Sequence, residues 1–270
     1  MSELKGLDAI RAYKKKMAEQ AAEREERAKN ADRPKPKYLR LGVDESVKVR
    51  FLQEMDTEAR NYDPNKGVGV GAVEHQGLDG NFKFRANCTV ETDRDNRCWA
   101  CEKARVAKQG SKEKGYSQRR NYYINVLVDR GDGNEPEVYI LSRGLNSSFV
   151  ADLMEETDEE GSITEKTYKL TRRGSGTDST YSLREVKNDT TFDSIDFDKL
   201  ELFDIESQVL RSIPYETDYE HRVFSQEQFY TQSPGDWKRI FANDDDDNAQ
   251  PATASTQKAD DAATSIEVGW

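Results

Sequence analysis

The sequence has few of the residues on which most enzymes and exported proteins depend. It holds only two histidines and three cysteines among 270 residues, and no run of about 18 apolar residues that could cross a membrane. The first residues lack the apolar stretch of a signal peptide, and the chain contains no Walker loop, HExxH or Gly-x-Ser-x-Gly motif. We therefore expect a cytoplasmic protein with no membrane partner and no enzymatic activity.

Hydrophobic residues are also scarce. They make up 34% of the chain, while Asp, Glu, Lys and Arg make up another 34%, and this apolar fraction is low for a protein that is globular from end to end. We expect one folded core over residues 37–242, with polar extensions on both sides. The formal net charge of -11 argues against a nucleic-acid ligand only until the charges are followed along the chain.

The two extensions have opposite charge. Residues 3–37 carry eleven Lys or Arg against seven Asp or Glu, with alanines at helical spacing, so residues 1–36 are predicted to form a charged helical arm that ends at Pro34. Residues 243–270 begin with NDDDD and contain almost nothing to bury. They are predicted to form a disordered acidic tail.

The core is predicted to be mostly β-structure with some helix. Strands are expected at residues 37–41, 47–52, 121–130 and 137–141, and a hairpin over residues 166–187 has its tip at 174–178. One amphipathic helix is expected from Leu145, with Phe149, Val150, Leu153 and Met154 on its inner side. About five short strands and one helix suggest a five-stranded barrel of the OB type, although periodicity leaves another α+β arrangement open.

All three cysteines lie in one stretch that also holds one of the two histidines. Between His75, Cys88, Cys98 and Cys101 there are twelve, nine and two residues. Three thiols and one imidazole favour a zinc ion in a closed tetrahedral site, which is structural because no coordination position stays open. The alternatives are a small buried Cys88 beside an accidental CWAC, and a redox pair, which would normally open a helix in a thioredoxin-like unit.

This spacing, together with the RRNYYINVLVD strand at residues 119–129, resembles the zinc-containing single-stranded DNA-binding protein of T-even-type bacteriophages. VRFL at residues 49–52 and EVYILSRGLNSSFVADLM at residues 137–154 fall in the same order. The resemblance covers residues 37–200. It implies an OB-fold core with a zinc subdomain inserted at about residues 70–120.

The resemblance also implies a function. Proteins of this family coat single-stranded DNA cooperatively during phage replication, recombination and repair, in the cytoplasm of the infected host. A basic N-terminal segment, matched here by Lys14, Lys15 and Lys16, would give self-association along DNA. The acidic tail, with Asp244, Asp245, Asp246, Asp247 and Trp270, would recruit replication and recombination proteins.

DNA-binding candidates come from the most basic window of the chain, from the hairpin and from the segment that matches the family. Residues 103–120 hold seven Lys or Arg and one acid, and cations along a groove with aromatic faces are what a single strand requires. The candidates are Arg50, Lys103, Arg105, Lys108, Lys112, Lys114, Tyr116, Arg119, Arg120, Tyr122, Tyr123, Arg172, Arg173 and Phe192.

Three features keep other hypotheses open. The loop TDRDNR at residues 92–97 lacks the aromatic residue that the family offers to DNA, so that stacking contact is not expected here. DSIDFD at residues 193–198 is compatible with a magnesium-dependent nuclease, and GVGVG at residues 67–71 is more typical of a flexible loop than of a phosphate site. The main alternative is a zinc-knuckle adaptor that binds proteins through its tail and does not bind DNA.

Overall fold

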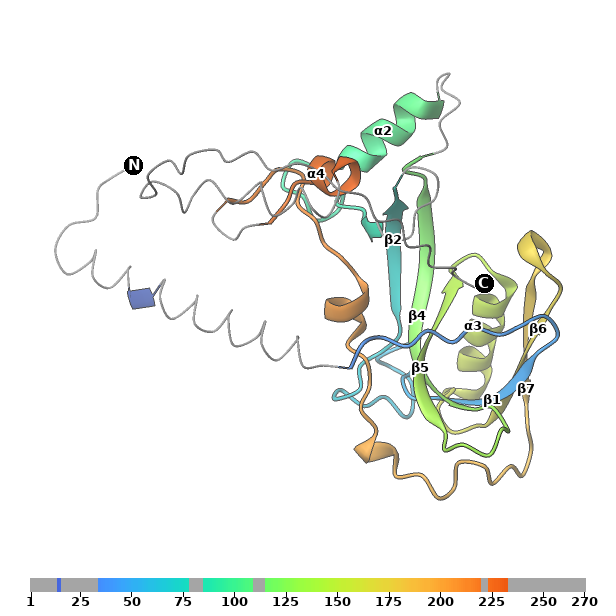
Figure 1. Cartoon of the computed structure of the whole chain (residues 1–270). Helices are drawn as coiled ribbons and strands as arrows, with labels where there is room; N and C mark the ends of the chain where they lie inside the picture. The colour runs from blue at the N-terminus through green and yellow to red at the C-terminus, as the bar shows by residue number, and fades with distance from the viewer. Residues whose placement is uncertain (1–13, 16–33, 78–84, 109–114, 220–222, 233–270) are drawn as a thin grey trace, which may run out of the picture.

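The computed structural model describes residues 14–15, 34–77, 85–108, 115–219 and 223–232. Of the predicted N-terminal arm, only Lys14 and Lys15 are described, and both are helical and exposed. The predicted acidic tail lies outside the described residues. Figure 1 shows the arrangement of the described elements, which are mostly strands with a few short helices.

The elements follow one another in an order that begins with strands. They are β1 (Ser46–Phe51), β2 (Val70–Gln76), β3 (Arg85–Asn87), α2 (Trp99–Lys108), β4 (Gln118–Asp129), β5 (Glu137–Gly144), α3 (Ser148–Glu160), β6 (Tyr168–Arg173), η3 (Gly176–Asp178), β7 (Thr180–Glu185), η4 (Phe197–Lys199), η5 (Ile205–Val209) and α4 (Gln226–Thr231).

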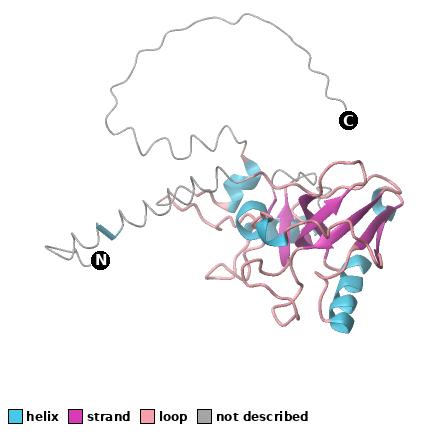
Figure 2. Cartoon of the chain, turned by 90° about the horizontal axis from the view of Figure 1, so that it is seen from below, coloured by secondary structure: helices cyan, strands magenta, loops and turns pink. Residues whose placement is uncertain are grey.

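The strands form one antiparallel sheet, which Figure 2 shows from below. Its order is β3-β2-β4-β1-β6-β7, and β5 pairs with the other edge of β4. The long strand β4 makes this possible, because its first half pairs with β2 and its second half with β1. Within the described residues the sheet is open, since no pairing joins β5 to β7.

Strand β4 is buried on both faces from Tyr122 to Val128, as this nearly continuous apolar run predicted. Tyr122, Ile124 and Val126 belong to the main core, which also contains the inner side of α3. On the opposite face, Asn125 is fully buried. Its side-chain Nδ2 donates to Phe203 O, and its Oδ1 accepts a hydrogen bond from Phe203 N–H, at 3.0 Å each. These two hydrogen bonds hold the segment of residues 190–210 against the outer face of the sheet.

The predicted helix and hairpin are both present. Helix α3 begins after Ser147, whose hydroxyl accepts a hydrogen bond from the Val150 N–H, and ends at Gly161, whose φ of 72° favours glycine. Met154 was predicted on the inner side but is 55% exposed. At 3.6 residues per turn, Phe149, Val150 and Leu153 already fill the buried stripe, and Met154 falls beyond its edge.

The predicted first strand, residues 37–41, forms only a short bridge. Tyr38 pairs in parallel with Ile140 of β5, through hydrogen bonds of 2.9 Å from Leu39 N and 2.7 Å to Lys37 O. This contact places residues 37–40 along the free edge of β5. No helix in the described part of the chain is long and apolar enough to span a bilayer.

Candidate metal centre and arginine cleft

The β2–β3 hairpin and the start of α2 bring the four predicted metal ligands together. His75 lies near the end of β2, Cys88 directly follows β3, and Cys98 and Cys101 flank the first residues of α2. The backbone N–H of Cys88 donates to Val73 O at 2.8 Å, which turns Cys88 back toward β2. The four ligand atoms lie within 4.8 Å of one another, so the group could hold one metal ion, as predicted.

The distances inside this group fit a tetrahedral ion. The Sγ atoms of Cys88 and Cys101 are 3.6 Å apart, and Cys101 Sγ is 3.3 Å from His75 Nε2. With metal–sulfur bonds of about 2.3 Å and a metal–nitrogen bond of about 2.0 Å, a tetrahedron has edges of roughly 3.5 to 3.8 Å. The chain therefore holds its ligands near the separations that a small tetrahedral cation requires.

Neighbouring groups orient the ligands. The imidazole of His75 is fully buried and its Nδ1 lies 2.7 Å from the carbonyl oxygen of Tyr116. Nδ1 therefore donates this hydrogen bond, and Nε2 is the ring nitrogen that faces the sulfur atoms and would bind a metal ion. The side-chain N–H of Gln118 lies 3.3 Å from Cys101 Sγ and supplies a hydrogen bond to that sulfur.

The electrostatics of the centre favour a cation. Burial acts against charge on Cys98, but hydrogen bonds from His75 and from the backbone of Thr89 and Cys101 together outweigh it and lower the pKa of the Cys98 thiol to about 6. Burial and the neighbouring Cys98 raise the pKa of Cys101 to about 12. Without a cation the sulfurs therefore cannot all ionise near neutral pH, whereas a bound metal ion would stabilise all three thiolates.

Side-chain hydrogen bonds hold the loop between Cys88 and Cys98 in a defined turn. The Asp93 carboxylate accepts hydrogen bonds from the backbone N–H groups of Asp95 and Arg97, at 3.0 Å each. The hydrogen bond from Arg97 is the main reason why the pKa of Asp93 is lowered. Asn96 adopts a positive φ of 53°, and the Thr89 hydroxyl donates to Arg97 O at 2.7 Å. The charged residues of this loop shape the turn that delivers Cys98.

The predicted aromatic contacts to DNA lie inside the protein. Tyr116, Tyr122, Tyr123 and Phe192 are 7%, 6%, 0% and 0% exposed. Tyr122 faces the core, while Tyr123 is covered from outside by the segment around Phe203 and Ile205. Adjacent strand residues point to opposite faces, and here both faces are covered, so the described structure offers no exposed ring at these four positions.

The predicted basic residues lie in different surroundings. Lys103 and Arg105 on α2, Arg119 and Arg120 on β4, and Arg173 on the hairpin are exposed. Arg172 is half-buried and donates to Leu41 O at 2.6 Å and Ser179 Oγ at 3.0 Å. Lys108 is the last residue of α2. The site residues predicted from the sequence that lie outside the described part are Lys16, Lys112, Lys114, Asp244, Asp245, Asp246, Asp247 and Trp270.

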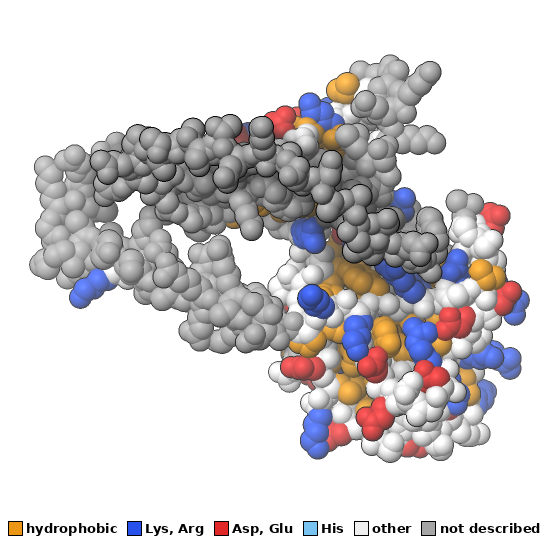
Figure 3. Space-filling view, viewed as in Figure 1, with side chains coloured by type: hydrophobic (Ala, Val, Ile, Leu, Met, Phe, Trp, Pro, Cys, Tyr) orange, Lys and Arg blue, Asp and Glu red, His pale blue; other side chains and the backbone are white. Residues whose placement is uncertain are grey.

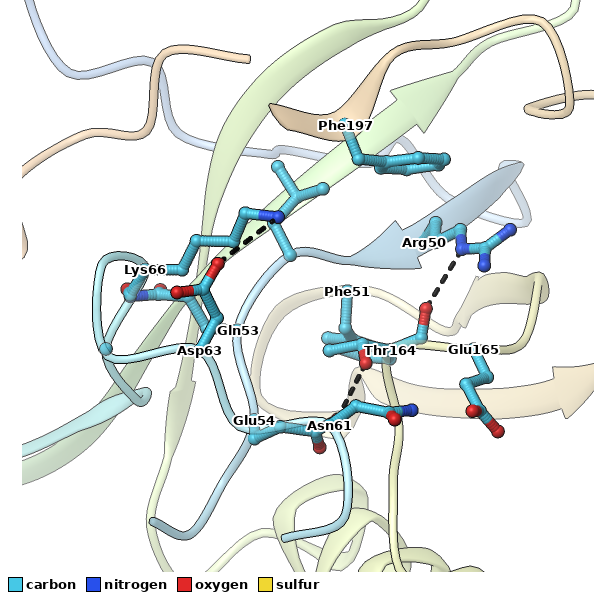
Figure 4. A pocket seen from close by; sticks show the side chains of 12 residues that line it. Arg50, Phe51, Gln53, Glu54, Asn61, Asp63, Lys66, Thr164, Glu165 and Phe197 are labelled. Carbon is cyan, nitrogen blue, oxygen red and sulfur yellow. Dashed lines mark hydrogen bonds and ion pairs between the residues drawn. The ribbon is translucent and has the colours of Figure 1, made fainter. Parts of the chain in front are cut away.

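Arg50 lies in a separate pocket of about 320 Å³, shown in Figure 4. Its Nε donates to Thr164 O at 2.9 Å, and its guanidinium group lies 4.7 Å from the centre of the Phe197 ring. Acidic side chains, including Asp63 and Glu165, line the same pocket. The mixed charge around Arg50 makes this pocket a poor groove for a polyanion.

The structure also forms a basic cleft that sequence reasoning missed, here named the arginine cleft. This cleft of about 710 Å³ contains no acidic side chain among the residues that line it. Its lining comprises Pro36, Tyr38, Leu39, Arg40, Arg85, Ser142, Arg143, Gln208, Val209 and Arg211. Figure 3 shows Lys and Arg side chains, interspersed with Asp and Glu side chains, around exposed hydrophobic atoms on one face of the molecule.

Arg143 is the most unusual group of the arginine cleft. Its Nε and Nη2 atoms are buried without a hydrogen-bond partner among the described residues, and its guanidinium carbon lies 3.4 Å from the centre of the Tyr181 ring. Burial, with a contribution from nearby Arg172, lowers the pKa of Arg143 to about 10. Its Nη1 donates to Ser142 O at 2.6 Å, so the guanidinium group is only partly paired and an anion close to it would stabilise its charge.

The four arginines of the cleft lie far apart in the sequence, outside the basic window of residues 103–120. Arg85 also pairs with the buried carboxylate of Glu74 at 3.0 Å. Only the pairing of residues 37–40 with β5 and the return of the chain at residues 208–211 bring the four together, so no local pattern could reveal them. No protein-family model, curated protein or solved structure matches the chain.

Proposed function

We propose that the protein binds single-stranded DNA, without enzymatic activity, through the arginine cleft. The cleft itself carries the proposal, because it gathers four arginines and no acid in a protein whose net charge is -11. Cations that replace the counterions of a nucleic-acid backbone supply most of its non-specific affinity. A cleft of about 710 Å³ is of the size that encloses small ligands, so it suits a few nucleotides of a single strand better than a duplex.

Tyr38 is the aromatic group that best suits base stacking in this proposal. It is half-buried, it lines the arginine cleft, and burial contributes most to the rise in its pKa. Stacking of one base on an exposed ring contributes about 1 to 3 kcal/mol without sequence preference. Tyr38 therefore takes the role that the sequence assigned to Tyr122 and Tyr123.

The metal in this proposal is one structural zinc ion. Three thiolates and one imidazole suit the borderline-soft Zn²⁺, and four protein ligands leave no position open for catalysis. When bound, the ion supplies folding free energy to the subdomain formed by β2, β3 and α2. This subdomain stands beside the arginine cleft, to which β3 contributes Arg85.

The proposed fold of the core is an OB-type barrel. The strands β5-β4-β1-β6-β7 follow one another in the sheet, and α3 connects β5 to β6. Five strands with one helix between the third and the fourth agree with the barrel that the sequence suggested. The metal-binding subdomain is then an insertion between the first and second strands of that barrel.

The resemblance to the single-stranded DNA-binding proteins of T-even-type phages extends the proposal. It adds cooperative coating of DNA during replication, recombination and repair in an infected bacterial cell. It also assigns the recruitment of replication proteins to residues 243–270. These roles rest on the residues quoted for the resemblance and are part of the same proposal.

The test compares variants of the arginine cleft with a matched surface variant. Arg40→Ala and Arg143→Ala should each weaken binding of labelled oligo(dT), measured by fluorescence anisotropy at constant salt. Lys187→Ala, which removes an exposed cation outside the cleft, should leave the affinity unchanged. Equal affinity of all three variants would show that the cleft does not hold DNA, and a complete lack of oligo(dT) binding would favour the adaptor alternative.

A further inference from the structure

Gln226 connects the C-terminal part of the chain to the metal centre. It is fully buried on α4, and its Oε1 accepts a hydrogen bond of 2.8 Å from the backbone N–H of Trp99. Its Nε2 donates to Thr89 Oγ1 at 2.9 Å and to Ile213 O at 3.1 Å. One amide therefore joins three separate segments of the chain.

The partners of Gln226 are next to metal ligands. Trp99 is the first residue of α2 and directly follows Cys98, and its N–H has no acceptor within the helix because it lies at the helix N-terminus. Thr89 directly follows Cys88, and its hydroxyl in turn donates to Arg97 O, the carbonyl before Cys98. Gln226 thus fixes the backbone beside Cys88 and on both sides of Cys98.

Ring packing strengthens the same contact. The ring of Tyr230 is stacked on Trp99 with 6.0 Å between centroids and 10° between planes, and it meets the edge of Tyr116. Phe229 belongs to the same buried cluster. Figure 1 shows α4 beside α2, so these rings form a second core that two distant parts of the chain share.

Polar contacts at the rim complete the docking. The guanidinium group of Arg97 lies 4.5 Å from the centre of the Tyr215 ring and donates to Glu216 at 2.7 Å. The Tyr215 hydroxyl donates to the Glu102 carboxylate at 3.0 Å. The described residues of this segment, 211–219 and 223–231, therefore contact the metal-binding subdomain at its centre and at its edge.

We propose that residues 211–219 and 223–231 form a metal-dependent latch, in which Gln226 is a positioning residue for Cys88 and Cys98. A bound metal ion fixes the backbone that Gln226 recognises, and Gln226 fixes the ligands that the metal requires. By thermodynamic reciprocity, each stabilises the other by the same factor. Metal loss then releases the segment and exposes Trp99, Phe229 and Tyr230.

This inference rests on the metal site of the proposed function but not on DNA binding. The experiment therefore uses the full chain without DNA, loaded with Zn²⁺ and titrated with a competing chelator. Gln226→Ala should weaken zinc binding about 10- to 100-fold, the usual effect of losing a group that orients metal ligands. Glu227→Ala, an exposed neighbour on the same helix, should bind zinc like the unaltered chain.

Hydrogen exchange supplies the second measurement. Removal of zinc should abolish protection of the amides of Gln226, Phe229 and Gln232, whose acceptors are Pro214 O, Ser225 O and Gln228 O. The Val126 amide in β4 should stay protected, which reports that the main sheet remains folded. Equal zinc affinity of Gln226→Ala and Glu227→Ala, or full protection of residues 226–232 after zinc removal, would overturn the latch.

A third variant covers the case in which Gln226→Ala loses the protection of Val126 and so fails to fold. Gln226→Glu keeps an acceptor for Trp99 N–H and loses the donor to Thr89 and Ile213. It should bind zinc more weakly than Glu227→Ala, and equal binding would again overturn the proposal. Because this experiment contains no DNA, failure of the latch can be distinguished from failure of the proposed DNA binding.

Discussion

Gly69 lies directly against the hydroxyl group of Tyr122, and a Cβ atom at position 69 would overlap the phenol oxygen. The N–H of Gly69 donates to Glu54 O at 2.9 Å, which aligns this residue just before β2 begins at Val70. The sequence suggested a flexible loop for GVGVG. The structure instead shows that part of this run packs closely against the core.

This contact makes Gly69→Ala destabilising by about 1 to 3 kcal/mol, because a well-packed core resists added atoms. Urea denaturation of the two variants Gly69→Ala and Gly71→Ala measures the effect. Gly71 is the control, since a Cβ there would meet Leu145 methyl groups at an ordinary 3.7 Å. Adding Tyr122→Phe to Gly69→Ala should restore only part of the stability, because the hydroxyl has no described partner to lose but the ring carbon Cζ would still overlap the new Cβ atom; no recovery at all would contradict the account.

Glu54 gives a second prediction about the core. Its buried carboxylate accepts hydrogen bonds from Ser162 Oγ and Thr164 Oγ1 at 2.6 Å and from Ile163 N at 3.1 Å. Glu54→Ala leaves these buried donors without an acceptor and should cost about 3 kcal/mol of unfolding free energy.

The matched control for Glu54 is Glu165→Ala. Glu165 is exposed and forms a surface ion pair with Arg60, and such pairs contribute little, about 0 to 1 kcal/mol. Thermal or urea unfolding of both variants provides the comparison. Similar stability of the two would show that the Glu54 hydrogen bonds do not hold the turn that leads into β6.

Metal removal tests the zinc assignment. Cys98→Ser should release the ion and weaken the packing around Trp99, which is 8% exposed. The expected results are loss of one zinc equivalent by elemental analysis and faster exchange of the amides in β2 and β3, while β6 and β7 stay protected. Full metal content in the Cys98→Ser protein would refute the ligand set.

The acidic tail gives a prediction that needs no knowledge of its structure. Residues 242–270 carry seven acids and one lysine, and at high effective concentration they would compete with DNA for a cationic cleft. Deletion of residues 243–270 should therefore tighten oligo(dT) binding, most strongly at low salt. Unchanged affinity at every salt concentration would show that the tail does not compete with DNA for the cleft.

Local patterns predicted several of the elements and the group of residues that could hold a metal ion. The spacing of His75, Cys88, Cys98 and Cys101 was enough to predict the ligand group. A closed site needs only four donor residues, and two of them stand in a Cys-x-x-Cys pair. Helix α3 and the β6–β7 hairpin were predicted from periodicity and turn residues. These features depend on interactions between residues that are near in sequence.

Long-range packing was not predictable in the same way. Nothing in the sequence near Gln226 indicates that its amide reaches Trp99, 127 positions away. Likewise, Tyr123 could be expected from the sequence to stack on a base at the surface, but in the structure the segment around Phe203 covers it. The arginine cleft shares this origin, since the segments that carry Arg40, Arg85, Arg143 and Arg211 meet only in the folded chain.

The salt dependence of oligo(dT) binding tests the central claim most directly. Arg85 is already paired with Glu74. If the other three cleft arginines replace about three counterions, the logarithm of the association constant should fall against the logarithm of salt with a slope of about -2. A duplex of the same length should bind more weakly at each salt concentration. Binding that prefers the duplex, or an affinity that does not change with salt, would contradict the proposal that the arginine cleft holds single-stranded DNA.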